Sequence, residues 1–73
     1  MLLNFAPVNT PLVLKSIKGG KDIRKRLTEL GLIDGCEFEV VQSSGSGPVM
    51  IRIHGSKIAI GKGMAHRIDI DVK

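Results

Sequence analysis

The chain contains little cysteine and no long apolar run. Cys36 is the only cysteine among 73 residues, so one chain can form neither an internal disulfide nor a four-thiolate metal site. No apolar run approaches the roughly 20 residues that a membrane-spanning helix needs. Residues 1–7 also lack the basic start and the apolar core of a signal peptide. We therefore expect a cytoplasmic protein without direct insertion into a membrane.

Aromatic side chains are scarce as well, which weakens two binding functions that are common among small domains. The chain has no Trp or Tyr, and its two Phe residues are Phe5 and Phe38. Single-strand nucleic-acid binders stack bases on exposed aromatic rings, and grooves for proline-rich peptides are lined with them. The net charge of +4 is modest too. Nucleic acid is thus disfavoured as a partner, and a basic small-barrel module that binds RNA or DNA is the alternative function.

Branched aliphatic residues dominate what is present. Nine Ile, seven Leu and six Val favour strands, and their spacing predicts a single domain over residues 1–73, with residues 1–10 irregular. The expected strands are residues 12–17, 36–42, 49–54, 57–60 and 68–72, with a type II′ turn at Gly55 and Ser56 between the third and the fourth. One helical turn near residues 63–66 is expected to be 3₁₀. About five short strands and one helix indicate a mainly β, closed or half-closed small barrel.

The helix is predicted near residues 21–31. Ile23, Leu27 and Leu30 recur at i, i+4 and i+7, so all three are expected in the core. Asp22 is expected to cap the start of the helix. Gly31 stands where a left-handed residue ends a helix, and Leu32 follows as its apolar contact.

The other side of this helix is rich in positive charge. Six of the eleven basic residues lie in positions 15–26, where Asp22 is the only acid. Such a face attracts an acidic partner, although a merely solvated helix face is the simpler explanation. We expect the stem of Arg26 to cover the barrel edge while its charge reaches a nearby acid or carbonyl. The predicted partner-binding residues are Lys21, Arg24, Lys25, Thr28, Leu32 and Ile33.

Catalytic and metal-binding groups are sparse. Cys36 begins a strand on its apolar face, so it is expected to be a small core residue rather than a nucleophile for His54 or His66. No paired carboxylates and no triad pattern accompany it, so we expect no enzyme and no cofactor. The possible metal ligands do not fall at a recognised ligand spacing; they are Cys36, His54, His66, Asp69 and Asp71. We predict no metal site, and weak binding of a transition metal is a further alternative.

Three segments together resemble the ferrous-iron transport protein A (FeoA) family. The resemblance covers about residues 12–72, and its most specific part is the helix, glycine and turn at 26–35. The segments read Arg26-Leu27-x-x-Leu30-Gly31-Leu32-x-x-Gly35, then Gly55-Ser56-x-Ile58-Ala59-Ile60, then Ala65 and Ile68.

The resemblance implies an SH3-like β-barrel that acts in the cytosol beside FeoB, the membrane ferrous-iron transporter with its own GTPase domain. It also implies the family's association with transition metal ions. The same module occurs at the C-terminus of metal-dependent repressors, and with no DNA-binding helices before it this chain resembles the stand-alone form. Unpaired edge strands could join two copies, so a homo-oligomer is a further expectation.

Overall fold

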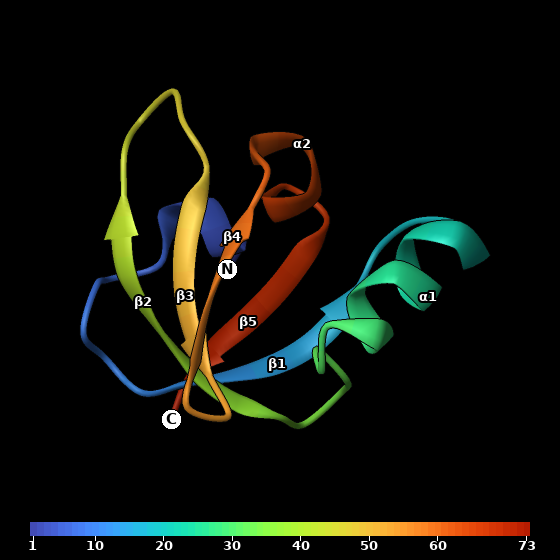
Figure 1. Ribbon diagram of the computed structural model, residues 1–73, viewed down its shortest axis with the longest axis horizontal. Coiled ribbons are helices and arrows are strands. Elements are labelled where there is room, and N and C mark those ends of the chain that lie inside the picture. The colour runs from blue at the N-terminus through green and yellow to red at the C-terminus, as the bar shows by residue number, and fades with distance from the viewer.

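The computed structural model describes residues 1–73 as one curled antiparallel sheet with two helices beside it (Figure 1). The strands are β1 (Leu12–Ile17), β2 (Glu37–Ser43), β3 (Val49–Ile53), β4 (Ser56–Ile60) and β5 (Ile68–Val72). The helices are α1 (Lys21–Glu29) and α2 (Lys62–Ala65), and η1 (Leu3–Phe5) is a 3₁₀ turn. The strand order β4-β3-β2-β1-β5 joins the first and last strands of the chain. The mainly β prediction is confirmed.

The core follows from the alternation of side chains along the strands. In β3 the burial alternates from Val49 to Ile53, as expected when successive side chains point to opposite faces. Fifteen residues are buried, and every one of them is hydrophobic. Phe38 and Leu27 belong to this cluster, while Ile23 and Cys36 are partly buried and pack against it. The predicted apolar faces of the strands therefore form one core.

The first residues are more ordered than the sequence indicates. Leu3, in η1, is only 1% exposed and belongs to the core. Val8 forms a parallel bridge with Val40 of β2, and Leu2 forms an antiparallel bridge with Asp69 of β5. The expectation of an irregular segment is wrong for Leu3–Phe5, which form η1, and the segment is packed onto the sheet.

The start of α1 differs from the prediction, whereas its end agrees. Gly20 occupies the N-cap position with no side-chain hydrogen bond, so Asp22 lies inside the first turn and is not the cap. At the other end Gly31 has φ +95°. The amide of Leu32 donates to the Leu27 carbonyl and the amide of Gly31 to the Thr28 carbonyl, both at 2.9 Å. These two bonds define a Schellman motif.

Because of this motif, two leucines show the opposite burial from the one predicted. Leu30 is 38% exposed, so its prediction as a core residue is wrong. Leu32 is 0% exposed, so its prediction as a partner-binding residue is wrong too. The reason is that α1 ends at Glu29 and the chain reverses at Gly31, which turns Leu32 inward against the last helical turn.

Two short turns also need correction. The β3–β4 turn consists of His54 and Gly55, with φ of 51° and 78°, and not of Gly55 and Ser56. Positive φ at both central residues is the mark of a type I′ turn, so the predicted type II′ turn is wrong. The last helical turn is α-helical rather than 3₁₀, since the amide of His66 donates to the Lys62 carbonyl four residues back.

Candidate functional site: the outer face of helix α1

The outer face of α1 is formed by the side of the helix that points away from the sheet. Its residues Lys21, Arg24, Lys25 and Thr28 are all exposed. Leu27 projects from the opposite side and is completely buried. In Figure 1 the helix stands beside the end of β1 and projects from the body of the domain. Four of the six predicted docking residues therefore lie together on one accessible surface.

Positive charge on this face is not neutralised within the chain. The structure contains three ion pairs, and none involves a basic residue of positions 15–26. The three pairs join the N-terminal amino group to Asp69, Arg52 to Glu39, and Lys73 to Glu37. An exposed cluster of unpaired cations keeps its full electrostatic attraction for an acidic surface.

Two residues of the outer face are held by hydrogen bonds. Nη2 of Arg24 donates to the Ile17 carbonyl at 3.1 Å, which ties the helix to the end of β1. The Thr28 hydroxyl donates to the Arg24 carbonyl at 2.7 Å. Arg26 makes no such bond, so the expectation that its charge reaches a carbonyl or an acid is wrong, and Arg24 has that role instead. Lys21 and Lys25 are left as the unattached cations of the face.

Exposed apolar side chains adjoin the end of α1. Ile33 is 53% exposed, as its predicted place in the docking set requires. Sequence reasoning missed Leu30, because its helical spacing equally fits a core position. The glycine at position 31 was the available signal, since a chain reversal there moves the last apolar helical residue outward.

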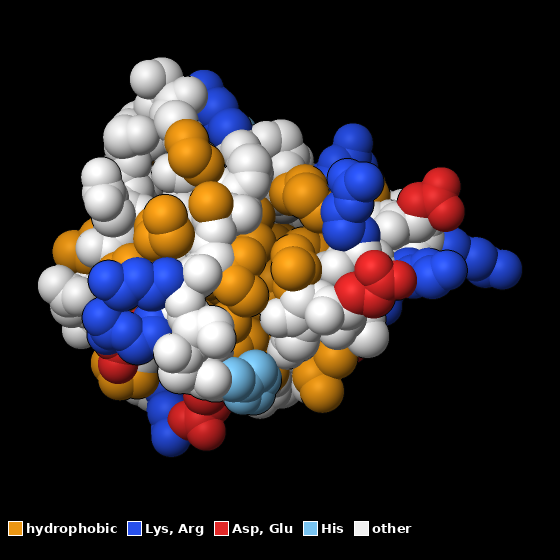
Figure 2. Space-filling model, in the orientation of Figure 1, with side chains coloured by type: hydrophobic (Ala, Val, Ile, Leu, Met, Phe, Trp, Pro, Cys, Tyr) orange, Lys and Arg blue, Asp and Glu red, His pale blue; other side chains and the backbone are white.

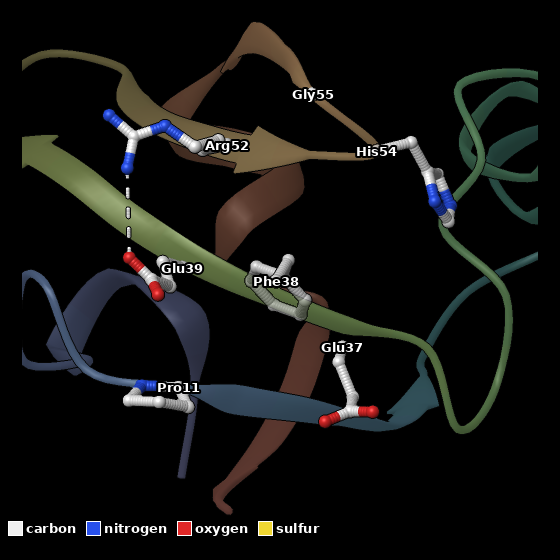
Figure 3. Close-up of a pocket in the computed structure, with 7 residues that line it drawn as sticks. All are labelled: Pro11, Glu37, Phe38, Glu39, Arg52, His54 and Gly55. Atoms are coloured by element: carbon white, nitrogen blue, oxygen red, sulfur yellow. Dashed lines mark ion pairs between the residues drawn. The ribbon is translucent and has the colours of Figure 1, made fainter.

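A hollow lies over the first residues of β2 and the end of β3 (Figure 3). Phe38 is the only hydrophobic residue in its lining. Arg52 and Glu39 form an ion pair of 3.8 Å across one side, and His54 lies at the far end beside the loop that follows α1. Neither cysteine nor serine contributes to this lining. The hollow offers charge but no nucleophile, so we assign it no chemistry.

The remaining candidate ligands do not converge. No group of three or more His, Cys, Asp or Glu side chains is placed to hold a metal ion. Partial burial raises the pKa of the Cys36 thiol, which disfavours the thiolate that would bind a metal or act as a nucleophile. The hydrogen bond from the N-terminal amino group lowers the pKa of Asp69 and occupies one of its oxygens. Helices α1, with nine residues, and α2, with four, are both too short to span a bilayer.

The fold and these surfaces define a small SH3-like domain with an exposed, positively charged helix face. The chain belongs to the FeoA family, whose domain pattern matches residues 1–72. A protein of Methanocaldococcus jannaschii that carries the name Fe(2+) transport protein A is 35% identical over 69 residues, which span 94% of this chain and 83% of that protein. The family is associated with ferrous-iron transport, so the resemblance seen in the sequence is confirmed.

Solved structures agree with this assignment. The crystal structure of an iron uptake regulatory protein, FeoA, matches with a TM-score of 0.87 and 32% sequence identity. The match covers 93% of this chain and 91% of that one. The zinc complex of Stenotrophomonas maltophilia FeoA, described as an SH3 domain protein, is 28% identical with a TM-score of 0.80, covering 97% and 89%. The predicted SH3-like fold is thereby confirmed. The bound zinc is a property of that relative.

Proposed function

We propose that this chain is a non-enzymatic accessory protein of ferrous-iron uptake, which acts in the cytoplasm by docking on an FeoB-like membrane transporter and modulating it. The observation that carries the proposal is the unpaired positive charge on the outer face of α1. Family membership supplies the process, since relatives are named for ferrous-iron transport.

The docking surface combines attraction and contact. Lys21 and Lys25 supply long-range attraction to an acidic region of the transporter's cytosolic part. Ile33, 53% exposed just after the C-terminal end of α1, supplies apolar area that such a contact can bury. Arg24 is fixed by its bond to the Ile17 carbonyl, so its guanidinium is presented in one position. A surface of this kind recognises its partner chiefly by charge.

Iron uptake by cells tests this function. In cells that lack the native gene, the wild-type chain should restore uptake of labelled ferrous iron, and Lys25→Glu should restore much less while remaining folded. Lys62→Glu makes the same charge change on an exposed residue of α2 and is the matched control. Full uptake with Lys25→Glu would show that the outer face of α1 is not the docking surface. Submicromolar, steeply salt-dependent binding to generic nucleic acid would favour the alternative function instead.

A further inference from the structure

The two edge strands of the sheet differ in whether other backbone groups cover their outer side. At the β5 edge, the amide of Ile70 donates to the Met1 carbonyl at 2.7 Å, and the N-terminal amino group donates to the Ile70 carbonyl at 2.9 Å. The bridge between Leu2 and Asp69 extends this cover. β4 is the other edge strand, and no backbone hydrogen bond outside the ladder involves Ser56–Ile60. An uncovered edge strand is a template for an additional strand.

The register identifies which groups of β4 are free. The two-residue turn places Ile53 opposite Ser56 as the hydrogen-bonded pair that closes the hairpin. Bonded and non-bonded pairs alternate along an antiparallel ladder. Lys57 and Ala59 therefore occupy non-bonded positions, and their N–H and C=O groups point away from β3. These four groups have the spacing that a new neighbouring strand requires.

An apolar groove runs beside this edge. Figure 2 shows a stripe of hydrophobic side chains between the β3–β4 hairpin and α1. Ile23 and Met64 line a cavity there together with Asp22 and Arg26. Ile58, on β4, is partly buried against the core and adds to the apolar surface at the edge.

We propose that the β4 edge binds an extended acidic peptide, which adds a strand next to β4 and inserts apolar side chains into this groove. Side chains alternate between the two faces of a strand, so every second residue of the peptide would enter the groove. The residues between them would lie beside Lys57 on the outer face. Main-chain hydrogen bonds would supply affinity, and the groove would supply specificity.

The charges at the groove favour an acidic occupant. Arg26 lines the groove and Lys57 is exposed on β4, and neither takes part in an ion pair. Asp22 is the single acid in the lining. Pairing two copies through β4 would bring the same cations of both copies together, which costs free energy. This surface is separate from the outer face of α1, so the inference goes beyond the proposed function.

Hydrogen exchange at individual amides tests the added strand directly. The probes are a synthetic peptide of alternating Ile and Asp and a control peptide of alternating Ile and Lys. Saturating Ile/Asp peptide should slow exchange of the Lys57 and Ala59 amides by at least about tenfold, and the Ile/Lys peptide should not. Unchanged exchange with the Ile/Asp peptide, equal protection by both peptides, or protection from self-association alone would overturn the proposal.

Substitutions on β4 provide a second test. Ala59→Pro removes an outward N–H, and proline is tolerated on an edge strand, so the chain should fold and bind the Ile/Asp peptide about tenfold more weakly. Ala59→Val keeps the N–H and should bind normally. Lys57→Glu should weaken binding, while Lys25→Glu should not. Equal affinity of Ala59→Pro and Ala59→Val, with both folded by circular dichroism, would contradict strand addition.

Discussion

Replacing Leu27 and Leu30 separately by alanine compares two leucines of one helix segment that differ in burial. Leu27 is 0% exposed in the core, whereas Leu30 is 38% exposed at the end of α1. Removing a fully buried leucine side chain costs its transfer free energy plus a cavity term, about 2–5 kcal/mol in total. Removing Leu30 loses only part of the transfer term and leaves no enclosed cavity, so about 1 kcal/mol or less is expected.

Urea unfolding followed by far-ultraviolet circular dichroism measures both free energies of unfolding, since the chain has no Trp or Tyr for fluorescence. A domain of 73 residues is expected to be stable by roughly 4–11 kcal/mol in total. Leu27→Ala should therefore remove a large share of that stability, and Leu30→Ala little. Equal losses for the two variants, or a loss below about 1 kcal/mol for Leu27→Ala, would refute the placement of α1 on the core.

Three further perturbations test other parts of the structure. Gly31→Ala and Gly35→Ala should each lower the free energy of unfolding by about 1–2 kcal/mol, because alanine is strained at positive φ. Gly31→Ala should lower it further, since the new Cβ would lie 3.2 Å from Cδ2 of His54, whereas Gly35 has open space around it. Equal urea midpoints for the two variants would contradict the contact with His54. Iodoacetamide at about pH 8 should alkylate Cys36 several-fold more slowly in the folded than in the unfolded chain, because burial raises its pKa and the thiolate is the nucleophile; equal rates would exclude this protection. Leu3→Ala should lower the free energy of unfolding by about 2–5 kcal/mol, and a negligible change would mean that η1 is not part of the core.

The strands were predictable because burial on one face imposes a period of two. Phe38 and Val40 alternate with Glu37 and Glu39, and β2 begins within one residue of its predicted start. Ile68–Val72 shows the same alternation and forms β5 with its predicted bounds. A pattern that is both apolar and periodic leaves few alternative registers, since a shift by one residue would expose every core side chain.

The errors fall where a single backbone angle decides the outcome. Leu30 and Leu32 are both apolar neighbours of Gly31, and only the Schellman reversal determines which of them is buried. The β3–β4 turn lies one residue earlier than predicted, because His54 adopts a positive φ, which few residues other than glycine do. Gly31 marks the first outcome in the sequence, whereas the residue type of His54 does not by itself specify the second.

The sequence predicts which residues of α1 are exposed, but not what binds to them. Helical spacing places Lys21 and Lys25 away from the core, and the structure shows both exposed. The sequence does not reveal whether these charges are paired. In the structure they are not, because the acids of β2 form ion pairs with Arg52 and Lys73 instead. Which partner binds there depends on the partner's own charges, which this sequence does not contain.

Affinity for the transporter is the most direct test of the central claim. The wild-type chain, Lys25→Glu and Lys62→Glu should each be titrated against the purified cytosolic part of an FeoB-like transporter at low and at physiological salt. The wild type should bind more tightly at low salt, Lys25→Glu should weaken binding by about tenfold, and Lys62→Glu should bind normally. Wild-type affinity for Lys25→Glu, or an equal loss for both variants, would contradict docking through the outer face of α1.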